Sequence, residues 1–139
     1  MTPLYQELHR WAAAPFIWGE MDCITCPCDW IMRVRGVDPA ADVRGTYDSR
    51  GSCHRQTGFF ADPIGVVDRY FSACGLHQVA TAAPGDVGLI QLRDEVGRVS
   101  PCGALWLGAA WGCKGTDGVT TVRPDQVPVM AIWEVGYVA

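Results

Sequence analysis

Residues 16–28 read FIWGEMDCITCPC, and this stretch decides how the chain begins to fold. An apolar turn leads into a helix whose start is fixed by Pro27. In a helix beginning at Asp22, Pro27 would lie past the first turn and its ring would clash with the carbonyl group of Cys23. We therefore expect a helix over residues 25–35, with Cys23 just before its N-terminus.

Capping residues predict further helices on both sides of this one. Thr2, followed by proline, opens a first helix that ends before Pro15. Asp62, also followed by proline, opens another that ends at Gly75. The irregular connection between the second and the last helix has room for a short helix that ends at Gly58.

After Gly75 the apolar residues form short runs separated by glycine, proline and aspartate, which is typical of antiparallel strands. The expected strands are residues 87–92, 102–107, 119–122 and 130–135. Helices followed by strands indicate an α+β fold. A chain of 139 residues without a long linker is the size of one domain, so residues 1–139 are expected to form a single unit.

Composition excludes several classes of protein. With 49% hydrophobic and 19% charged residues, the chain is expected to be globular. Its net charge of −4 argues against a nucleic-acid partner, which would require a basic surface. The N-terminal segment lacks the basic and apolar regions of a signal peptide, and the longest apolar run, residues 102–111, is too short for membrane insertion. We therefore expect folding in a cytoplasm.

Three motifs carry a resemblance to a known family. They are Trp18-Gly19-x-x-Asp22-Cys23, the turn Pro84-Gly85-Asp86-Val87 before the first strand, and the strand Gly103–Gly108. Together they resemble the NlpC/P60 type of papain-like cysteine peptidase. The resemblance implies N-terminal helices packed on a C-terminal antiparallel sheet, with Cys23 at the position of the nucleophile.

A more specific similarity covers nearly the whole chain. The segments Gly36–Tyr47, Gly115–Gly118 and Ala131–Gly136 are similar to small proteins of unassigned function encoded in the tail gene clusters of tailed phages and gene transfer agents. This resemblance implies a structural component of the virion tail tip or baseplate, made in the bacterial host cytoplasm, with tail hub and distal tail proteins as partners. The alternative it leaves open is an active endopeptidase that cuts peptidoglycan during envelope penetration.

The residues at the expected catalytic positions are unusual for a peptidase. A helix N-terminus favours a thiolate, and a nearby histidine completes the nucleophile–base pair. In the resembled family the histidine lies on the second strand, where this chain has Cys102, and a later polar group corresponds to Cys113. The catalytic set is therefore Cys23, Cys102 and Cys113, without the histidine, and we expect negligible peptidase activity. The three histidines of the chain lie elsewhere, at positions 9, 54 and 77.

The chain is cysteine-rich, with seven cysteines, and in a reducing compartment a disulfide framework is not the default interpretation. Two interpretations remain open. In one, the centre has decayed and its thiols fill space in the core. In the other, convergent thiols bind Zn²⁺ or an iron–sulfur cluster. The candidate ligands are Cys23, Cys26, Cys28, Cys102 and Cys113.

Other polar and aromatic residues are expected to be structural. Asp22 is predicted to be a helix cap or a turn residue, and Asp86 to hold a turn. Arg44 is expected to pair with an aspartate of the same chain. Trp106 and Trp111 are compatible with a place in the core or in an interface.

Overall fold

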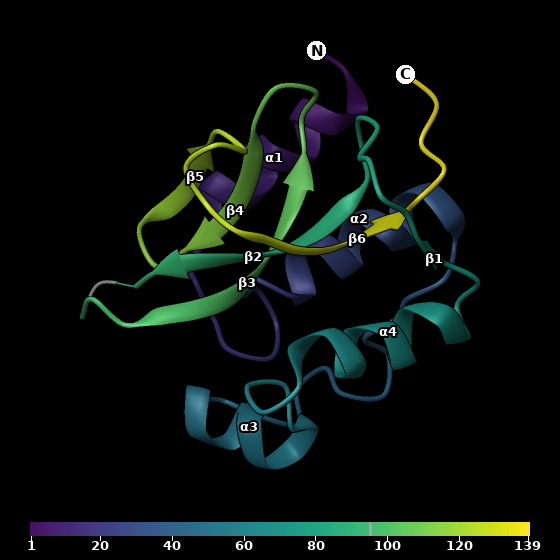
Figure 1. Ribbon diagram of the computed structural model, residues 1–139. Coiled ribbons are helices and arrows are strands. Elements are labelled where there is room, and N and C mark those ends of the chain that lie inside the picture. Colours follow the sequence, from purple (N-terminus) through teal and green to yellow (C-terminus); the bar gives the residue numbers. More distant parts are fainter. Residues whose placement is uncertain (95) are drawn as a thin grey trace.

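The computed structural model describes residues 1–94 and 96–139, which form four α-helices and a six-stranded sheet (Figure 1). The helices are α1 (Pro3–Ala13), α2 (Thr25–Arg35), α3 (Arg50–Thr57) and α4 (Pro63–Ala73). The strands are β1 (His77–Gln78), β2 (Val87–Arg93), β3 (Val99–Trp106), β4 (Trp111–Gly115), β5 (Gly118–Val122) and β6 (Val129–Glu134). The predicted α+β class is confirmed. Within the described residues, no helix has both the length and the hydrophobicity needed to cross a membrane.

The helix boundaries follow the capping residues. Thr2 accepts a hydrogen bond from the Tyr5 N–H at the start of α1, and Gly36 ends α2 in the left-handed conformation with φ of 76°. The predicted span of α2 is confirmed at both ends. The strand predictions are less complete, because β1 and β4 were not expected and β3 begins at Val99, upstream of the predicted start.

The sheet is antiparallel and has the strand order β1-β6-β2-β3-β4-β5. Strand β2 is central, and it pairs with β3 along its whole length, with Ile90 opposite Cys102. Strands β3 and β4 pair only at Leu105–Gly112 and Trp106–Trp111. The two strands therefore do not pair at the level of Cys102.

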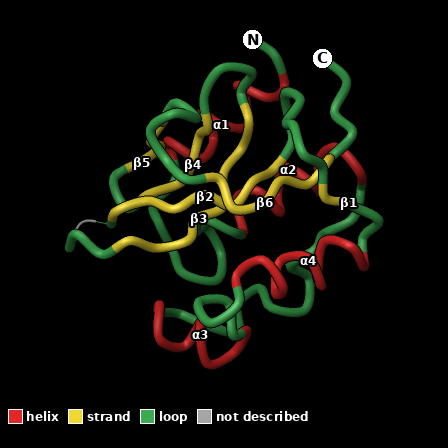
Figure 2. The backbone as a smooth tube through the Cα atoms, viewed as in Figure 1, coloured by secondary structure: helices red, strands yellow, loops and turns green. Residues whose placement is uncertain are grey.

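Helices α1 and α2 lie together behind the sheet, whereas α3 and α4 lie at its lower side in the view of Figure 2. The main core between helices and sheet contains three tryptophans with no exposed surface, Trp11, Trp30 and Trp133. A second, smaller core gathers on β2, β3 and β4 around Ile90, Ala104 and Trp111. Cys102 and Cys113 belong to this smaller core, and Cys23 packs against it.

Candidate functional site

The turn before α2 is organised by the buried carboxylate of Asp22. Its Oδ1 atom accepts hydrogen bonds from the N–H groups of Ile24 at 2.9 Å and Thr25 at 2.8 Å. Its Oδ2 atom accepts from the Gly19 N–H at 2.8 Å and from the Tyr47 hydroxyl at 2.9 Å. In return, the Asp22 N–H donates to Thr25 Oγ1 at 2.8 Å. Asp22 therefore holds the turn before α2, one of the two roles predicted for it, while the N-cap position itself is Ile24, which makes no side-chain cap hydrogen bond.

This network also determines the surroundings of Cys23. The N–H groups at the start of a helix are the groups that would stabilise a thiolate at this place. The two that follow Cys23, those of Ile24 and Thr25, already donate to the Asp22 carboxylate. Cys23 thus lies at the start of α2, as expected, but the first N–H groups of the helix serve the fold.

Close packing brings the start of α2 onto strand β3. A Cβ atom at Gly103 would collide with the carbonyl oxygen of Cys23 and would lie 3.0 Å from Ile24 Cδ1. Only glycine leaves room for this approach. Because Gly103 follows Cys102 directly, the approach places Cys23 beside Cys102.

Three cysteines meet at this point, and we call Cys23, Cys102 and Cys113 the thiol cluster. Cys102 and Cys113 lie in the smaller core, Cys23 packs against that core, and all three line the same groove. The neighbouring thiols of Cys113 and Cys23, together with burial, raise the pKa of the Cys102 thiol well above its ordinary value. The Cys102 Sγ atom also lies 3.4 Å from the Gly103 carbonyl oxygen, as donor. Cys102 is therefore a neutral thiol beside Cys23.

The thiol cluster forms the floor of a groove of about 520 Å³. Cys23 is half-buried, whereas Cys102 and Cys113 are buried. Aromatic and basic side chains surround the opening: Phe16 packs edge-on against Trp18 at 5.2 Å between ring centroids, and the Arg50 guanidinium lies 3.8 Å from the centre of the Phe60 ring. A ligand in the groove would meet Cys23 first.

A hydroxyl group in the wall of the groove has no partner. Ser100, on β3, lines the groove, and its Oγ atom is buried without a hydrogen bond among the described residues. A buried polar atom without a partner costs about 1–3 kcal/mol. It therefore marks a place where a polar ligand group would improve the site.

No histidine of the described chain lines this groove. All three histidines are exposed on the surface, at positions 9, 54 and 77. His54 lies near the rim, with its ring centre 6.2 Å from that of Phe60. The groove thus holds a cysteine at the start of a helix without an imidazole beside it.

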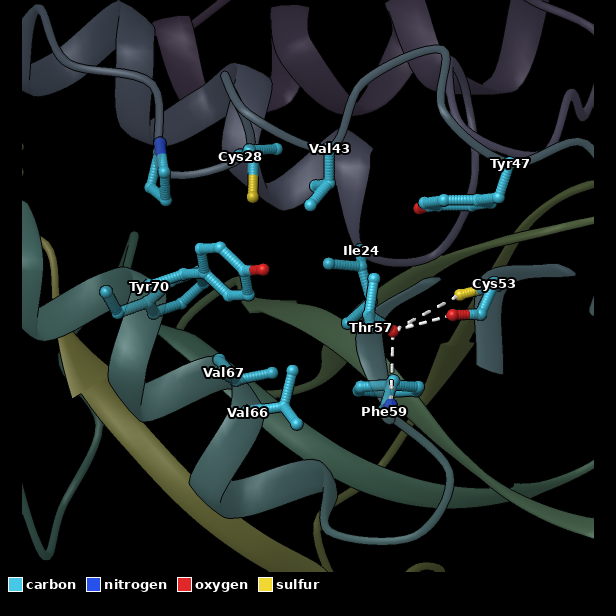
Figure 3. A pocket seen from close by; sticks show the side chains of 13 residues that line it. Ile24, Cys28, Val43, Tyr47, Cys53, Thr57, Phe59, Val66, Val67 and Tyr70 are labelled. Atoms are coloured by element: carbon cyan, nitrogen blue, oxygen red, sulfur yellow. Dashed lines mark hydrogen bonds between the residues drawn. The ribbon is translucent and has the colours of Figure 1, made fainter. Parts of the chain in front are cut away.

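The other two predicted thiol ligands point away from the thiol cluster. Cys28 points into a small apolar cavity of about 40 Å³ between α2, α3 and α4, where it faces Tyr70 and Val43 (Figure 3). Burial raises the pKa of Cys28 well above its ordinary value. Cys26 lies in the main core, with its Sγ atom 3.0 Å from the Met21 Sδ atom.

The structure therefore divides the five predicted metal ligands between two places. Cys23, Cys102 and Cys113 come together, and Cys26 and Cys28 do not join them. Within residues 1–94 and 96–139, no group of three or more His, Cys, Asp or Glu side chains is arranged to hold a metal ion. The site as it stands does not fit Zn²⁺ or an iron–sulfur cluster.

A buried lysine was missed by the sequence interpretation. Lys114, on β4, is 2% exposed, and its Nζ atom donates to the carbonyl oxygen of Trp11 at 2.6 Å and to that of Ala14. Both carbonyl groups lie at the C-terminal end of α1, where a positive charge is favoured. The only available signal was a single lysine within an otherwise uncharged run of glycine, cysteine and tryptophan.

The remaining polar predictions are confirmed as structural roles. Arg44 forms ion pairs of 2.7 Å with both Asp38 and Asp29. The Asp86 carboxylate accepts from the N–H groups of Ala83 at 2.8 Å and Val135 at 3.0 Å, which ties the turn before β2 to the end of the sheet. These residues hold the fold and do not line the groove.

Comparison with known proteins gives one family and no closer relative. No curated protein and no solved structure matches the chain at a significant level. A family described as "Domain of unknown function (DUF6950)" matches residues 2–135, which is nearly the whole chain. The chain therefore belongs to this family of domains of unknown function.

Proposed function

We propose that this chain is a structural component of the tail tip or baseplate of a tailed phage or gene transfer agent, built on an NlpC/P60-like fold with a degenerate peptidase centre. The fold-level support is a cysteine at the start of a buried helix, packed on an antiparallel sheet. The observation that carries the loss of activity is that Cys102, and no imidazole, lies beside Cys23 in the groove. A neutral thiol stands where a base is required, and general-base assistance contributes roughly 10²–10⁴ to the rate of such reactions.

The partners in this proposal are the tail hub and distal tail proteins. A second groove, of about 540 Å³, lies over the sheet and is lined by Trp106, Trp111 and Ile132. Tryptophan is enriched at the centres of protein interfaces. The Nε1 donor of Trp111 is buried without a hydrogen-bond partner among the described residues, so a partner's acceptor group would satisfy it. This groove is the surface that we assign to tail assembly.

The rival function is an active peptidoglycan endopeptidase. One observation favours it: Cys23 is half-buried and faces an open groove of about 520 Å³, as a nucleophile requires. Against it stands the absence of an imidazole from the lining of that groove in the described chain. The two functions differ in whether the Cys23 sulfur is needed for cleavage.

Release of muropeptides from purified peptidoglycan tests the proposal. We expect the wild-type protein and Cys23→Ala to release equal, background amounts, with an active cell-wall hydrolase as the positive control in the same assay. Release by the wild type that disappears in Cys23→Ala would establish the rival function. Co-purification with tail hub and distal tail proteins from virions tests the structural role, and we expect Trp106→Ala to weaken it, whereas the exposed-surface variant Tyr5→Ala should not.

A further inference from the structure

The three thiols of the thiol cluster differ in how exposed they are to solvent, and the proposed function makes no use of this difference. Cys23 is half-buried and faces the groove, Cys102 is 8% exposed, and Cys113 is 1% exposed. Cys102 and Cys113 belong to the smaller core, and Cys23 packs against it. A reagent that enters the groove therefore meets one thiol, and a second thiol lies behind it.

We propose that the thiol cluster is a site of reversible oxidation, in which Cys23 is oxidised by a hydroperoxide and then forms a disulfide with Cys102. The inference concerns this site alone and holds whether or not the chain belongs to a virion tail. It assigns a modification to Cys23, with Cys102 as the thiol that resolves it.

The chemistry has two balanced steps. First, the Cys23 sulfur attacks the distal oxygen of the hydroperoxide, the O–O bond breaks, and Cys23 becomes a sulfenic acid while the alcohol, or water from hydrogen peroxide, leaves. Second, the Cys102 sulfur attacks the Cys23 sulfur, the S–O bond breaks, and the hydroxide leaves as water with the Cys102 proton. The hydroperoxide supplies the oxidising equivalents for both steps.

The geometry favours Cys102 over the other thiols as the resolving group. It belongs to the smaller core against which Cys23 packs, and the neighbouring Gly103 lies directly against the Cys23 carbonyl oxygen. A disulfide bond is about 2.0 Å long, so the two neighbouring sulfur atoms must approach each other to form it. Cys102 is opposite Ile90 of β2 and is not paired with β4 at this level, so the closure leaves the strand pairing intact.

The cysteines outside the thiol cluster are less suited to this role. Cys26 and Cys28 are enclosed in the main core and its small cavity. Cys53 lies on α3, where its Sγ atom is 3.9 Å from Thr57 Oγ1, and Cys74 lies at the end of α4. Among them, Cys53 is the competitor to be tested, because it is close enough to Cys23 to interact with it electrostatically.

The experiment uses the whole reduced chain with one equivalent of hydrogen peroxide, followed by non-reducing peptide mapping by mass spectrometry. We expect a Cys23–Cys102 cross-link and a fall in free thiols from seven to five, since one disulfide consumes two, with full recovery after dithiothreitol. Cys102→Ala should instead accumulate the sulfenic acid at Cys23, trapped by dimedone. Cys74→Ala, the matched control, should form the same cross-link as the wild type.

Several outcomes would overturn the inference. They are a Cys23–Cys53 bond, a disulfide between two chains, or seven free thiols after peroxide treatment. Circular dichroism of Cys102→Ala checks that the variant is folded, and Cys102→Ser provides a second variant if it is not. A cross-link that forms equally in urea would show that the fold does not direct the pairing, and it would also reject the proposal.

Discussion

The two sides of Cys23 differ in how their polar atoms are satisfied. On the helix side, the Asp22 carboxylate accepts four hydrogen bonds. On the strand side, the only two buried side-chain nitrogen or oxygen atoms without a partner in the described residues are Ser100 Oγ and Trp111 Nε1. Buried polar atoms are normally paired. The polar groups of the helix side thus serve the fold, whereas two polar atoms of the strand side have no partner in the described residues.

The largest effect is expected at Asp22. Replacing it by alanine removes the acceptor for four donors, so we expect Asp22→Ala to lower the free energy of unfolding by about 3 kcal/mol. Urea denaturation at neutral pH measures the change. Asp42 is exposed and serves as the control, because Asp42→Ala should change stability by less than about 0.5 kcal/mol. A loss below about 1 kcal/mol in Asp22→Ala would contradict the assigned role.

An intermediate effect is expected from pH on the helix side. Burial raises the pKa of Cys28 well above its ordinary value of 9.0, so the folded chain keeps this proton where the unfolded chain loses it. The resulting stability is fully present below the unfolded pKa and is lost as the pH rises above it. We expect this thiol to contribute a fall of about 1.4 kcal/mol per pH unit in alkaline solution.

Urea denaturation under reducing conditions at a series of alkaline pH values measures that slope. Cys28→Ala should make the decline with pH shallower, since the variant has no proton to lose at this position. Cys74→Ala removes a half-buried thiol that packs against the edge of the main core and serves as the control, with a slope equal to that of the wild type. Equal slopes in all three proteins would show that Cys28 ionises as readily in the folded chain as in the unfolded one.

The smallest effect is expected at Ser100, and it sharpens the contrast with Asp22. Because the Ser100 hydroxyl is buried without a partner, Ser100→Ala removes no hydrogen bond and relieves a desolvation cost. We expect the free energy of unfolding to stay within about 0.5 kcal/mol of the wild type or to rise. Threonine at this position keeps the hydroxyl and is the comparison variant. A loss above about 1 kcal/mol in Ser100→Ala would reveal a hydrogen bond that the hydroxyl makes in solution.

Local sterics made the start of the fold predictable. A proline ring has one acceptable place near a helix start, so Pro27 fixed the beginning of α2, and glycine at position 36 fixed its end. The strand β4 was missed for the opposite reason. Trp111 and Cys113 are two residues apart on β4, and both pack in the smaller core. The glycines and the lysine of this strand make that alternation of buried residues hard to recognise in the sequence.

The site was predictable in part. The family spacing placed Cys102 and Cys113 opposite Cys23, and the structure brings these three together. Cys26 and Cys28 were grouped with them because they are near in sequence. Residues two apart on a helix point in different directions, so these two thiols cannot both face the same ligand from α2. The helix predicted for residues 25–35 was therefore sufficient to predict that Cys26 and Cys28 face different directions.

The enclosed ammonium group of Lys114 has a practical consequence for experiments on assembly. Lys114 is the only lysine in the sequence, and its Nζ atom is held by the carbonyl groups at the end of α1. Amine-directed cross-linkers and succinimidyl ester labels will therefore find no accessible side-chain amine on the folded chain. The same property makes acylation of Lys114 a selective chemical reporter of unfolding, readable by mass spectrometry in a mixture of proteins.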